Sequence, residues 1–377
     1  MSPFAALGPA GRLAAANLFE EKLRLSLSVL GVALAVMLIL ILLGLRAGVY
    51  KGTRAYLENS PGSIVVLPKG TRTTFAVAGK QLPPGTTDAV TRVDGVARVV
   101  PVLRMGSIPD LHGKKEYVVL VGYDRALGGG PWELASGREP AANNEVVLDR
   151  VLAERHGFAV GQPFTLAGHE LEVVGLSSGT SSWVGTFVFA SKRLVEELIL
   201  VPGATNVLLV TPAAGVKTSD LIGRLGVIPD ISVLPKSEVI EGDQKVIAGV
   251  FNQVLSVMVI AALLVGTLVV GMVIYTATIE RRREYGVLRA LGAGNITLYE
   301  TVIVQALVAA GLGVVSGVGV AYVGGLVIMD YRPQFMVAIE PPALLMTLGA
   351  GFLIALLGAF VPARTVARLA PADVFRR

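Results

Sequence analysis

The sequence predicts an α-helical membrane protein with four transmembrane helices and a large extracytoplasmic mixed α/β domain inserted between helices 1 and 2. Three observations predict it. The 377 residues are 53% hydrophobic and only 16% charged, whereas about a quarter of the residues in soluble domains are charged. The mean hydropathy is +0.66. The apolar residues gather in one block near the N-terminus and three in the last third, with basic residues at the ends of the blocks.

The first block, Leu25 to Leu45, contains no charge, and a helix of about 20 such residues crosses a bilayer. We assign residues 25–47 to transmembrane helix 1 and residues 1–24 to a cytoplasmic amphipathic segment. The alternative is a cleaved signal peptide, whose apolar part would be about 7 to 15 residues long and end in small residues. Arg46 and Lys51 follow here instead, which favours a retained span.

The other blocks are equally free of charge, running from Val246 to Ile279, from Thr301 to Met329 and from Pro341 to Ala363. A buried helix of a soluble core could also be apolar on all sides. In a membrane, however, a charged residue at the centre of a helix costs about 2.5 to 3.5 kcal/mol, so four charge-free blocks favour membrane spans. The second block exceeds the bilayer thickness, so we expect its start to form a stalk outside it. The expected segments are 246–279 (stalk and helix 2), 300–328 (helix 3), 329–341 (short external loop) and 342–362 (helix 4).

The distribution of lysine and arginine predicts the orientation, because cytoplasmic segments are enriched in both. Basic residues occur in the N-terminal segment (Arg12, Lys22, Arg24), in the loop between spans two and three and in the tail 363–377, whereas the loop after span three has only Arg332. Both termini are therefore expected in the cytoplasm of a multi-pass protein of the cell (inner) membrane. Residues 48–245 are then extracytoplasmic.

The segment 48–245 has the pattern of a mixed α/β domain. Short β-branched runs alternate with helical stretches and turn signals such as Leu82-Pro83-Pro84-Gly85. Asp149 to His156 is expected to form a short helix, and Phe164 to Val174 a hairpin that turns at Ala167-Gly168-His169. The other expected strands include Ser63 to Leu67, Glu116 to Val121, Glu145 to Leu148 and Val184 to Phe189.

Residues 280–299 combine charges with an apolar face. At helical spacing, Val287, Leu288 and Leu291 share one side, and Gly292 with Gly294 can end the helix before the next span. This spacing predicts a short amphipathic helix at the cytoplasmic side. Periodicity alone leaves two readings open, a solvated loop that sets orientation or a protein-docking element.

This stretch, from Ile279 to Ala293, resembles the cytoplasmic loop of FtsX-like permeases of the MacB, LolC, DevC and haem-exporter kind, with its Glu-Arg-x-Arg-Glu-Tyr-Gly order before span three. The tail from Val361 to Asp373 is similar to the ending of the same family after span four. Glu145 to Leu148, Gly157 to Gln162 and Leu171 to Gly175 resemble a recurring segment of its outer domain. With the layout of one plus three spans, the resemblance covers almost the whole chain.

The resemblance implies a permease subunit of an ABC transporter of the mechanotransmission type, paired with a second copy of itself or a homologous permease. The partners implied are two copies of an ABC ATPase subunit, the lipid bilayer and, where there is an outer membrane, a periplasmic adaptor. The loop would then be the coupling helix, where the ATPase docks. Its expected residues are Glu280, Arg281, Arg282, Arg283, Glu284, Tyr285, Gly286, Leu288, Arg289, Leu291 and Gly292.

Other residue patterns argue against chemistry within this chain. There is no G-x-x-x-x-G-K-[ST] loop, so ATP and Mg are expected on a partner ATPase, a separate polypeptide because few residues precede span one. No hydrolase motif appears, and we assign no catalytic residue, no metal site and no cofactor. The methionines of the spans suit core packing better than haem ligation, and the basic residues form no nucleic-acid patch.

Gly313 and Gly317 have the small-xxx-small spacing that lets two helices approach closely. The partner could be span two or four of the same chain, and glycine is also simply common in membrane helices. The resemblance places the dimer contact mainly between spans one and two of two protomers.

Two functions compete. The first is export or extraction of an amphipathic or hydrophobic substrate, in which motion driven by ATP hydrolysis is relayed along the stalk to the outer domain. The alternative is an FtsX-type transmembrane signalling scaffold that regulates an extracytoplasmic cell-wall hydrolase. An outer segment of about 200 residues resembles the MacB, LolC and DevC kind more than the shorter one of division scaffolds. A membrane-anchored enzyme would need a catalytic constellation that the sequence does not display.

Overall fold

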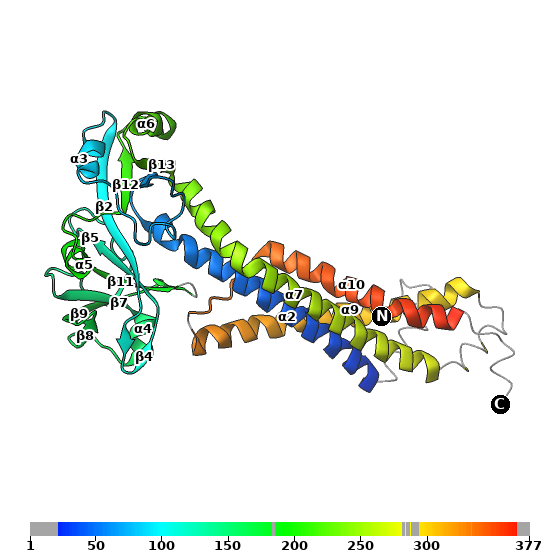
Figure 1. Ribbon diagram of the computed structural model, residues 1–377. Helices are drawn as coiled ribbons and strands as arrows, with labels where there is room; N and C mark the ends of the chain where they lie inside the picture. Colours follow the sequence, from blue (N-terminus) through cyan, green and yellow to red (C-terminus); the bar gives the residue numbers. More distant parts are fainter. Residues whose placement is uncertain are drawn as a thin grey trace. The chain divides into compact units, whose positions relative to one another are not determined.

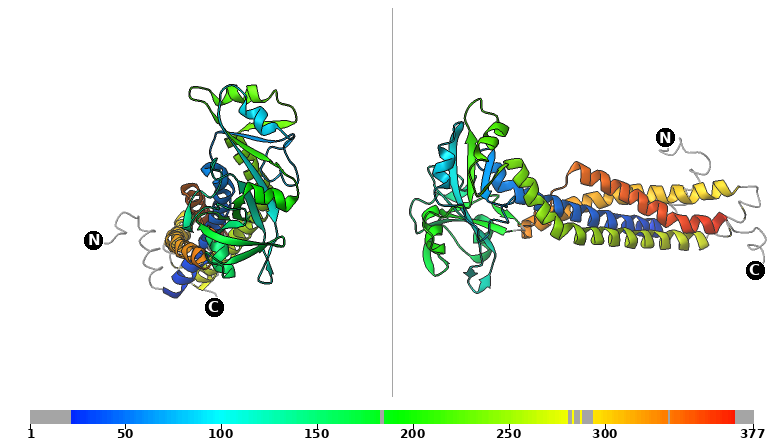
Figure 2. Two further views of the ribbon diagram at one scale, coloured as in Figure 1. Left: turned by 90° about the vertical axis from the view of Figure 1, so that its left-hand side faces the viewer. Right: turned by 45° about the horizontal axis from the view of Figure 1, so that its top comes forward.

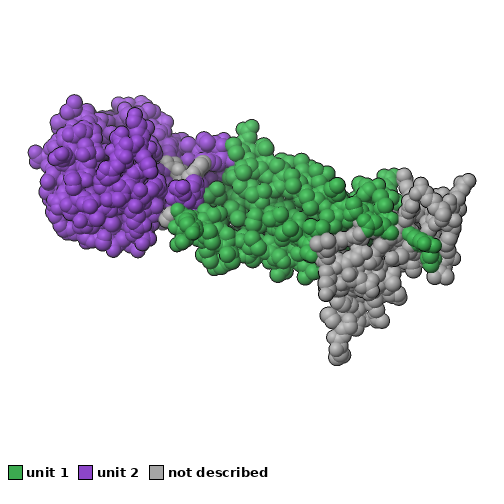
Figure 3. All heavy atoms as spheres, turned by 90° about the horizontal axis from the view of Figure 1, so that it is seen from below, with its two compact units in different colours: residues 1–47, 252–331, 337–377 green, residues 48–251, 332–336 purple. Residues whose placement is uncertain are grey.

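The computed structural model describes residues 22–182, 185–280, 283, 287, 294–332 and 334–367 (Figure 1). The chain divides into two compact units, coloured in Figure 3. One unit contains residues 1–47, 252–331 and 337–377, and the other contains residues 48–251 and 332–336. We call them the helical unit and the α/β unit.

Four long helices carry the apolar blocks: α2 (Lys22–Asn59), α7 (Lys236–Glu280), α9 (Asn295–Tyr331) and α10 (Pro341–Ala367). Each contains a stretch long and apolar enough to cross a membrane, which confirms the predicted four-helix arrangement. Helix α2 runs beyond residue 47 and ends at Asn59, just before Ser60-Pro61-Gly62, because the residue before a proline disfavours helical geometry. Helix α7 begins at Lys236, ahead of the charge-free run.

The helical unit has its own apolar core. Small and β-branched side chains from all four helices meet there, including Val36 of α2, Val270 of α7, Val314 of α9 and Ile354 of α10. Figure 2 shows these helices running side by side. The faces turned away from the core expose large apolar residues such as Leu264, Val315 and Leu357. Such exposure is expected of a surface covered by lipid.

The α/β unit is built on a sheet whose described strands run in the order β13-β1-β12-β2-β5-β11-β7-β9-β6, with β10 on β11 and β8 on β9. Two further short strands, β3 and β4, form a separate pair. The strands are β1 (Ile64–Pro68), β2 (Val96–Ser107), β3 (Asp110–Leu111), β4 (Lys114–Lys115), β5 (Val118–Tyr123), β6 (Leu134–Gly137), β7 (Glu145–Asp149), β8 (Pro163–Leu166), β9 (His169–Ser177), β10 (Ser181–Ser182), β11 (Gly185–Ser191), β12 (Val207–Pro212) and β13 (Ile231–Pro235).

Strand β1 is buried on both faces, and alternate side chains enter different cores. Ile64 and Val66 join a core with residues of α3 (Thr86–Thr91) and α6 (Thr218–Leu225). Val65 and Leu67 join a second core that includes Tyr56 of α2 and residues of α7. Because side chains alternate across a strand, the sheet separates the short helices α3 and α6 from the ends of α2 and α7.

The other half of the sheet is covered by α4 (Arg150–His156) and α5 (Lys192–Ile199), whose apolar residues join a third core around Phe164. The expected short helix is present as α4, and Asp149 caps it by accepting from the Val151 and Leu152 amides. The expected hairpin is formed by β8 and β9. It turns at Ala167 and Gly168, both with positive φ, the geometry of a tight hairpin.

Candidate functional site

The predicted coupling loop lies between the end of α7 at Glu280 and the start of α9 at Asn295. Of the expected docking residues, the structure describes Glu280 and Arg283, both exposed. Val287, on the expected apolar face, has helical backbone and is 43% exposed. The other expected docking residues lie outside the described part: Arg281, Arg282, Glu284, Tyr285, Gly286, Leu288, Arg289, Leu291 and Gly292. Their role remains a prediction from the sequence.

Gly313 and Gly317 of α9 lie against α2. A Cβ at Gly313 would be 2.6 Å from the Cβ of Val32, and one at Gly317 would be 2.6 Å from the carbonyl oxygen of Ala33. The packing partner is therefore the first span rather than the second or fourth. The face of α2 that carries Val32, Ala33 and Val36 has small or β-branched side chains, and the glycine backbone of α9 packs closely against it.

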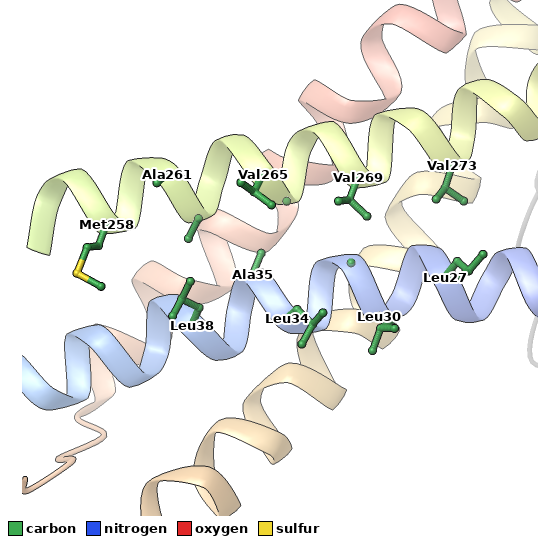
Figure 4. A pocket seen from close by; sticks show the side chains of 13 residues that line it. Leu27, Leu30, Leu34, Ala35, Leu38, Met258, Ala261, Val265, Val269 and Val273 are labelled. Atoms are coloured by element: carbon green, nitrogen blue, oxygen red, sulfur yellow. The ribbon is translucent and has the colours of Figure 1, made fainter. Parts of the chain in front are cut away.

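Helices α2 and α7 also approach each other through small residues. A Cβ at Gly31 would lie 2.7 Å from Val269, and one at Gly266 would lie 2.7 Å from Ala35. Beside this contact is an apolar groove of about 430 Å³ along the two helices (Figure 4). Its lining includes the exposed side chains Leu30, Leu34, Met258 and Val265.

Within the α/β unit, the end of α2 and the start of α7 are tied together. The Lys236 ammonium donates to the Ser60 carbonyl at 2.6 Å, and the Lys236 amide donates to the Ser63 carbonyl at 2.8 Å. The unpaired carbonyls at a helix C-terminus carry partial negative charge and favour a cation. Lys236 therefore fixes the first turn of α7 to the last residues of the α2 segment.

Both helices are also anchored within the α/β unit, α2 on strand β11 and α7 on the loop that follows β1. The Tyr56 hydroxyl of α2 donates to the Gly129 carbonyl at 2.9 Å, and its ring stacks on Phe187 of β11 with a centroid distance of 5.5 Å. On α7, the Asp243 carboxylate is 1% exposed and accepts from the Thr74 amide and hydroxyl, each at 2.7 Å. Each helix end thus has one buried polar anchor, Tyr56 on α2 and Asp243 on α7.

Arg104 of β2 lies between these anchors. Its guanidinium carbon is 4.9 Å from the centre of the Tyr56 ring and 5.7 Å from that of Phe187, the geometry of a cation–π interaction. Burial lowers the pKa of Arg104, and the nearby Asp243 carboxylate opposes that shift. Among the described residues, the buried Nε of Arg104 has no hydrogen-bond partner. We call Tyr56, Arg104, Lys236 and Asp243 the anchor cluster.

The anchor cluster is not apparent from the sequence, because its members come from three distant segments and no motif connects them. One signal was available. Lys236 and Asp243 precede the charge-free run of the second span. Charged residues next to the start of a membrane helix are candidates for contacts that hold the helix in place.

Two further carboxylates of the α/β unit, Glu145 and Asp149, are buried and have hydrogen-bond partners within the fold. Arg138 holds Glu145 with two hydrogen bonds, of 2.7 and 2.6 Å, and lowers the pKa of Glu145 to about 2. Burial raises the pKa of Asp149, whose carboxylate caps α4 and accepts from Thr180. Across the described residues, no group of three or more His, Asp or Glu side chains could hold a metal ion.

Two family models match the chain. The one described as MacB-like periplasmic core domain matches residues 25–226, more than half of the chain, and the one described as FtsX-like permease C-terminal matches residues 256–371. The chain belongs to the MacB-type family of FtsX-like permeases. The sheet unit between the first two apolar helices is the MacB-like core domain of this permease, and the predicted coupling loop lies within the FtsX-like part.

Several curated relatives of this FtsX-like permease are named macrolide export ATP-binding/permease proteins MacB. That of Hyphomonas neptunium is 29% identical over 232 residues, which cover 56% of this chain and 34% of the relative. MacB 1 of Yersinia pestis is 27% identical over 123 residues (33% and 19%). The probable syringafactin export protein SyfD of Pseudomonas syringae is 29% identical over 123 residues (33% and 18%). The permease thus spans about a third or less of the length of these relatives.

Two solved structures are similar to part of the FtsX-like permease. The periplasmic region of MacB from Actinobacillus actinomycetemcomitans has a TM-score of 0.38 at 14% identity and covers 49% of this chain and 94% of that chain. The extracellular domain of YknZ from Gram-positive bacteria has a TM-score of 0.36 at 13% identity and covers 46% and 100%. The family matches, rather than these two likenesses, establish the relationship.

Proposed function

We propose that the chain is the permease subunit of an ABC transporter that couples ATP hydrolysis by a separate ATPase subunit to export or extraction of an amphipathic or hydrophobic substrate. The observation that carries this proposal is the continuity of α2 and α7. Each helix contains an apolar stretch suited to a membrane and continues without a break into residues of the α/β unit. A rigid helix can carry a displacement along its length, whereas a flexible linker cannot.

Two ATPase subunits, each binding ATP and Mg, would dock on the cytoplasmic loop. The charges of the loop would fix the register of the complex and its apolar residues would supply contact area. Closure of the ATPase pair would then displace α7 and α9, which flank the loop, and α2, against which Gly313 and Gly317 of α9 are packed.

The anchor cluster would receive this displacement in the α/β unit. Lys236 joins the end of α2 to the start of α7, and Arg104 lies on the Tyr56 ring. Within the α/β unit, a motion of either helix end would therefore reach β2 and β11 through these contacts. This mechanotransmission does not require the substrate to cross the lipid. It is consistent with spans whose apolar runs contain no charged residue that could line a polar pathway.

Two permease copies are expected to associate through the apolar groove between α2 and α7. Its exposed leucines and valines would be covered by the same helices of a second copy or of a homologous permease. The names of the relatives, which specify export of a macrolide and of syringafactin, support export as the direction. By the distribution of lysine and arginine, both termini are cytoplasmic and the α/β unit is extracytoplasmic.

The test is a mild-detergent purification of the tagged chain from native membranes, followed by mass spectrometry of the proteins that accompany it. A stoichiometric ABC ATPase, whose activity rises in the presence of the permease, is the expected result. Recovery of a cell-wall hydrolase with the complex, and no effect of an added substrate on ATP hydrolysis, would instead support the signalling-scaffold alternative.

A further inference from the structure

Three of the glycines of helix α2, Gly44, Gly48 and Gly52, are spaced four residues apart. Residues at this spacing lie on one face of a helix, so their backbones form a shallow track without side chains. Within the α/β unit, Gly52 packs against Ser182, since a Cβ at Gly52 would lie 2.6 Å from the Cβ of Ser182. Gly44 and Gly48 contact a different part of the chain.

The segment between α9 and α10 is seated on Gly44 and Gly48. In the helical unit, the Ala338 amide donates to the Gly44 carbonyl at 2.9 Å. In the α/β unit, a Cβ at Gly48 would stand 1.7 Å from the carbonyl oxygen of Met336 and 2.6 Å from its carbonyl carbon. Such distances are impossible for any residue with a side chain, so this contact requires glycine at position 48.

Val337 secures the segment between two helices. Its side chain is 7% exposed, and its Cγ1 would lie 2.8 Å from a Cβ at Gly44 of α2 and 3.3 Å from one at Gly325 of α9. The neighbouring Gln334 is less well accommodated, since its buried Oε1 has no hydrogen-bond partner among the described residues. An unpaired buried acceptor is unfavourable. If the segment were released, water could donate to the Gln334 Oε1, and this would offset part of the free energy needed for the release.

We propose that residues 334–338 form a strap that fixes the axial position of α2 at rest and lifts from Gly48 when α2 moves. At the positions between these glycines, side chains project from the surface of α2. The next glycine lies four residues, about 6 Å, along the helix. A smaller axial shift would therefore press a side chain against the Met336 carbonyl. The strap therefore resists small displacements of α2 and yields to a full step. This inference rests on the proposed function, in which the ATPase drives that step.

The chain contains no cysteine, so one introduced thiol can report on the strap. The reporter is V337C in the full-length, detergent-solubilised chain, labelled with a hydrophilic maleimide. Labelling is expected to be slow at rest and about tenfold faster when G48A removes the seat, because protection follows local opening. The matched control is G311A on α9, where an added Cβ meets no atom within 4 Å and labelling should stay slow.

A second reporter separates lifting of the strap from unfolding. Ala306 is 1% exposed in the core of the helical unit, and A306C should stay protected in the G48A background. Labelling of both reporters would overturn the proposal, because Gly48 would then support the whole bundle rather than a strap. Equal labelling of V337C with and without G48A would also overturn it.

The final arm adds the copurified ATPase with ATP and Mg. Faster labelling of V337C in the chain that retains Gly48 is the expected result. Unchanged labelling in a complex that hydrolyses ATP would overturn the strap while leaving the proposed function intact. If no ATPase accompanies the chain, the proposed function fails, and the comparison of G48A with G311A at rest still decides whether the seat exists.

Discussion

Gly271 of α7 and Gly358 of α10 meet backbone to backbone. A Cβ at Gly271 would lie 3.2 Å from the Gly358 carbonyl oxygen, and one at Gly358 would lie 3.1 Å from the Gly271 nitrogen. A Cβ on either glycine would therefore force the backbone of the other helix to move by a few tenths of an ångström. Because lipid provides little hydrophobic drive for helix association, such close van der Waals contact is a principal source of packing between membrane helices.

Replacement of Gly358 by alanine is expected to destabilise the helical unit by about 1 to 3 kcal/mol, since overpacking forces backbones apart. The measurement is the thermal unfolding midpoint in detergent. Gly349→Ala on the same helix is the control, because its Cβ meets no atom within 4 Å. It should be neutral or stabilise by up to about 1 kcal/mol through helix propensity. Equal midpoints for the two variants would contradict the crossing geometry.

Gly317 and Gly319 offer a second matched pair, both on α9. Gly317→Ala is expected to lower the unfolding midpoint, because its Cβ would meet the Ala33 carbonyl oxygen at 2.6 Å, whereas Gly319→Ala meets nothing within 4 Å. The expected difference is again about 1 to 3 kcal/mol. If Gly319→Ala proved the more harmful change, the assignment of the α9 face that contacts α2 would be wrong.

Arg104 and the Tyr56 ring should be energetically coupled. A double-mutant cycle with Arg104→Met and Tyr56→Leu is expected to give a coupling energy of about 0.5 to 2 kcal/mol, the range of cation–π contacts. The cycle with Tyr56→Phe keeps the ring and loses only the hydrogen bond to Gly129, so it should give much less coupling. Denaturant unfolding of the full chain measures all variants. Equal coupling in both cycles would assign the effect to the hydroxyl instead.

The Glu145–Arg138 pair predicts a pH dependence of stability. The pKa of Glu145 is lowered to about 2 from 4.5, so its stabilising effect is fully present above pH 4.5 and is lost as the pH falls towards about 2. Glu145→Gln lacks this titration and is expected to flatten the decline in unfolding midpoint between pH 5 and about 3. Parallel curves for the two proteins would show that the pair contributes no such stability.

The docking prediction is tested by Leu288→Asp, which places a negative charge on the expected apolar face of the coupling loop. We expect loss of ATPase stimulation without loss of the folded permease, because a charge at the centre of an apolar contact is strongly unfavourable. The unfolding midpoint of the variant controls for stability. Unchanged ATPase stimulation and unchanged recovery of the complex would contradict the assignment of Leu288 to the docking surface.

Local patterns in the sequence were sufficient for much of the fold. Charge-free runs predicted the four long helices. The turn at Ala167-Gly168-His169 predicted a hairpin and the stretch from Asp149 to His156 a short helix, and both are present as β8–β9 and α4. The motif around Glu280 to Gly292 pointed to the family that the comparisons then established. Each of these signals depends on neighbours in the chain, as do helix length, capping and turn geometry.

The tertiary structure alone decided which distant segments meet. The sequence spacing marked Gly313 and Gly317 as packing residues, but only the structure shows α2 as their partner, because any apolar helix could accept them. Likewise, no local rule brings Lys236 to Ser60, Arg104 to Tyr56, or the Met336 carbonyl onto Gly48. These contacts depend on how the strands pair and the helices cross, and that arrangement is set by the combined packing of the whole chain rather than by any one segment.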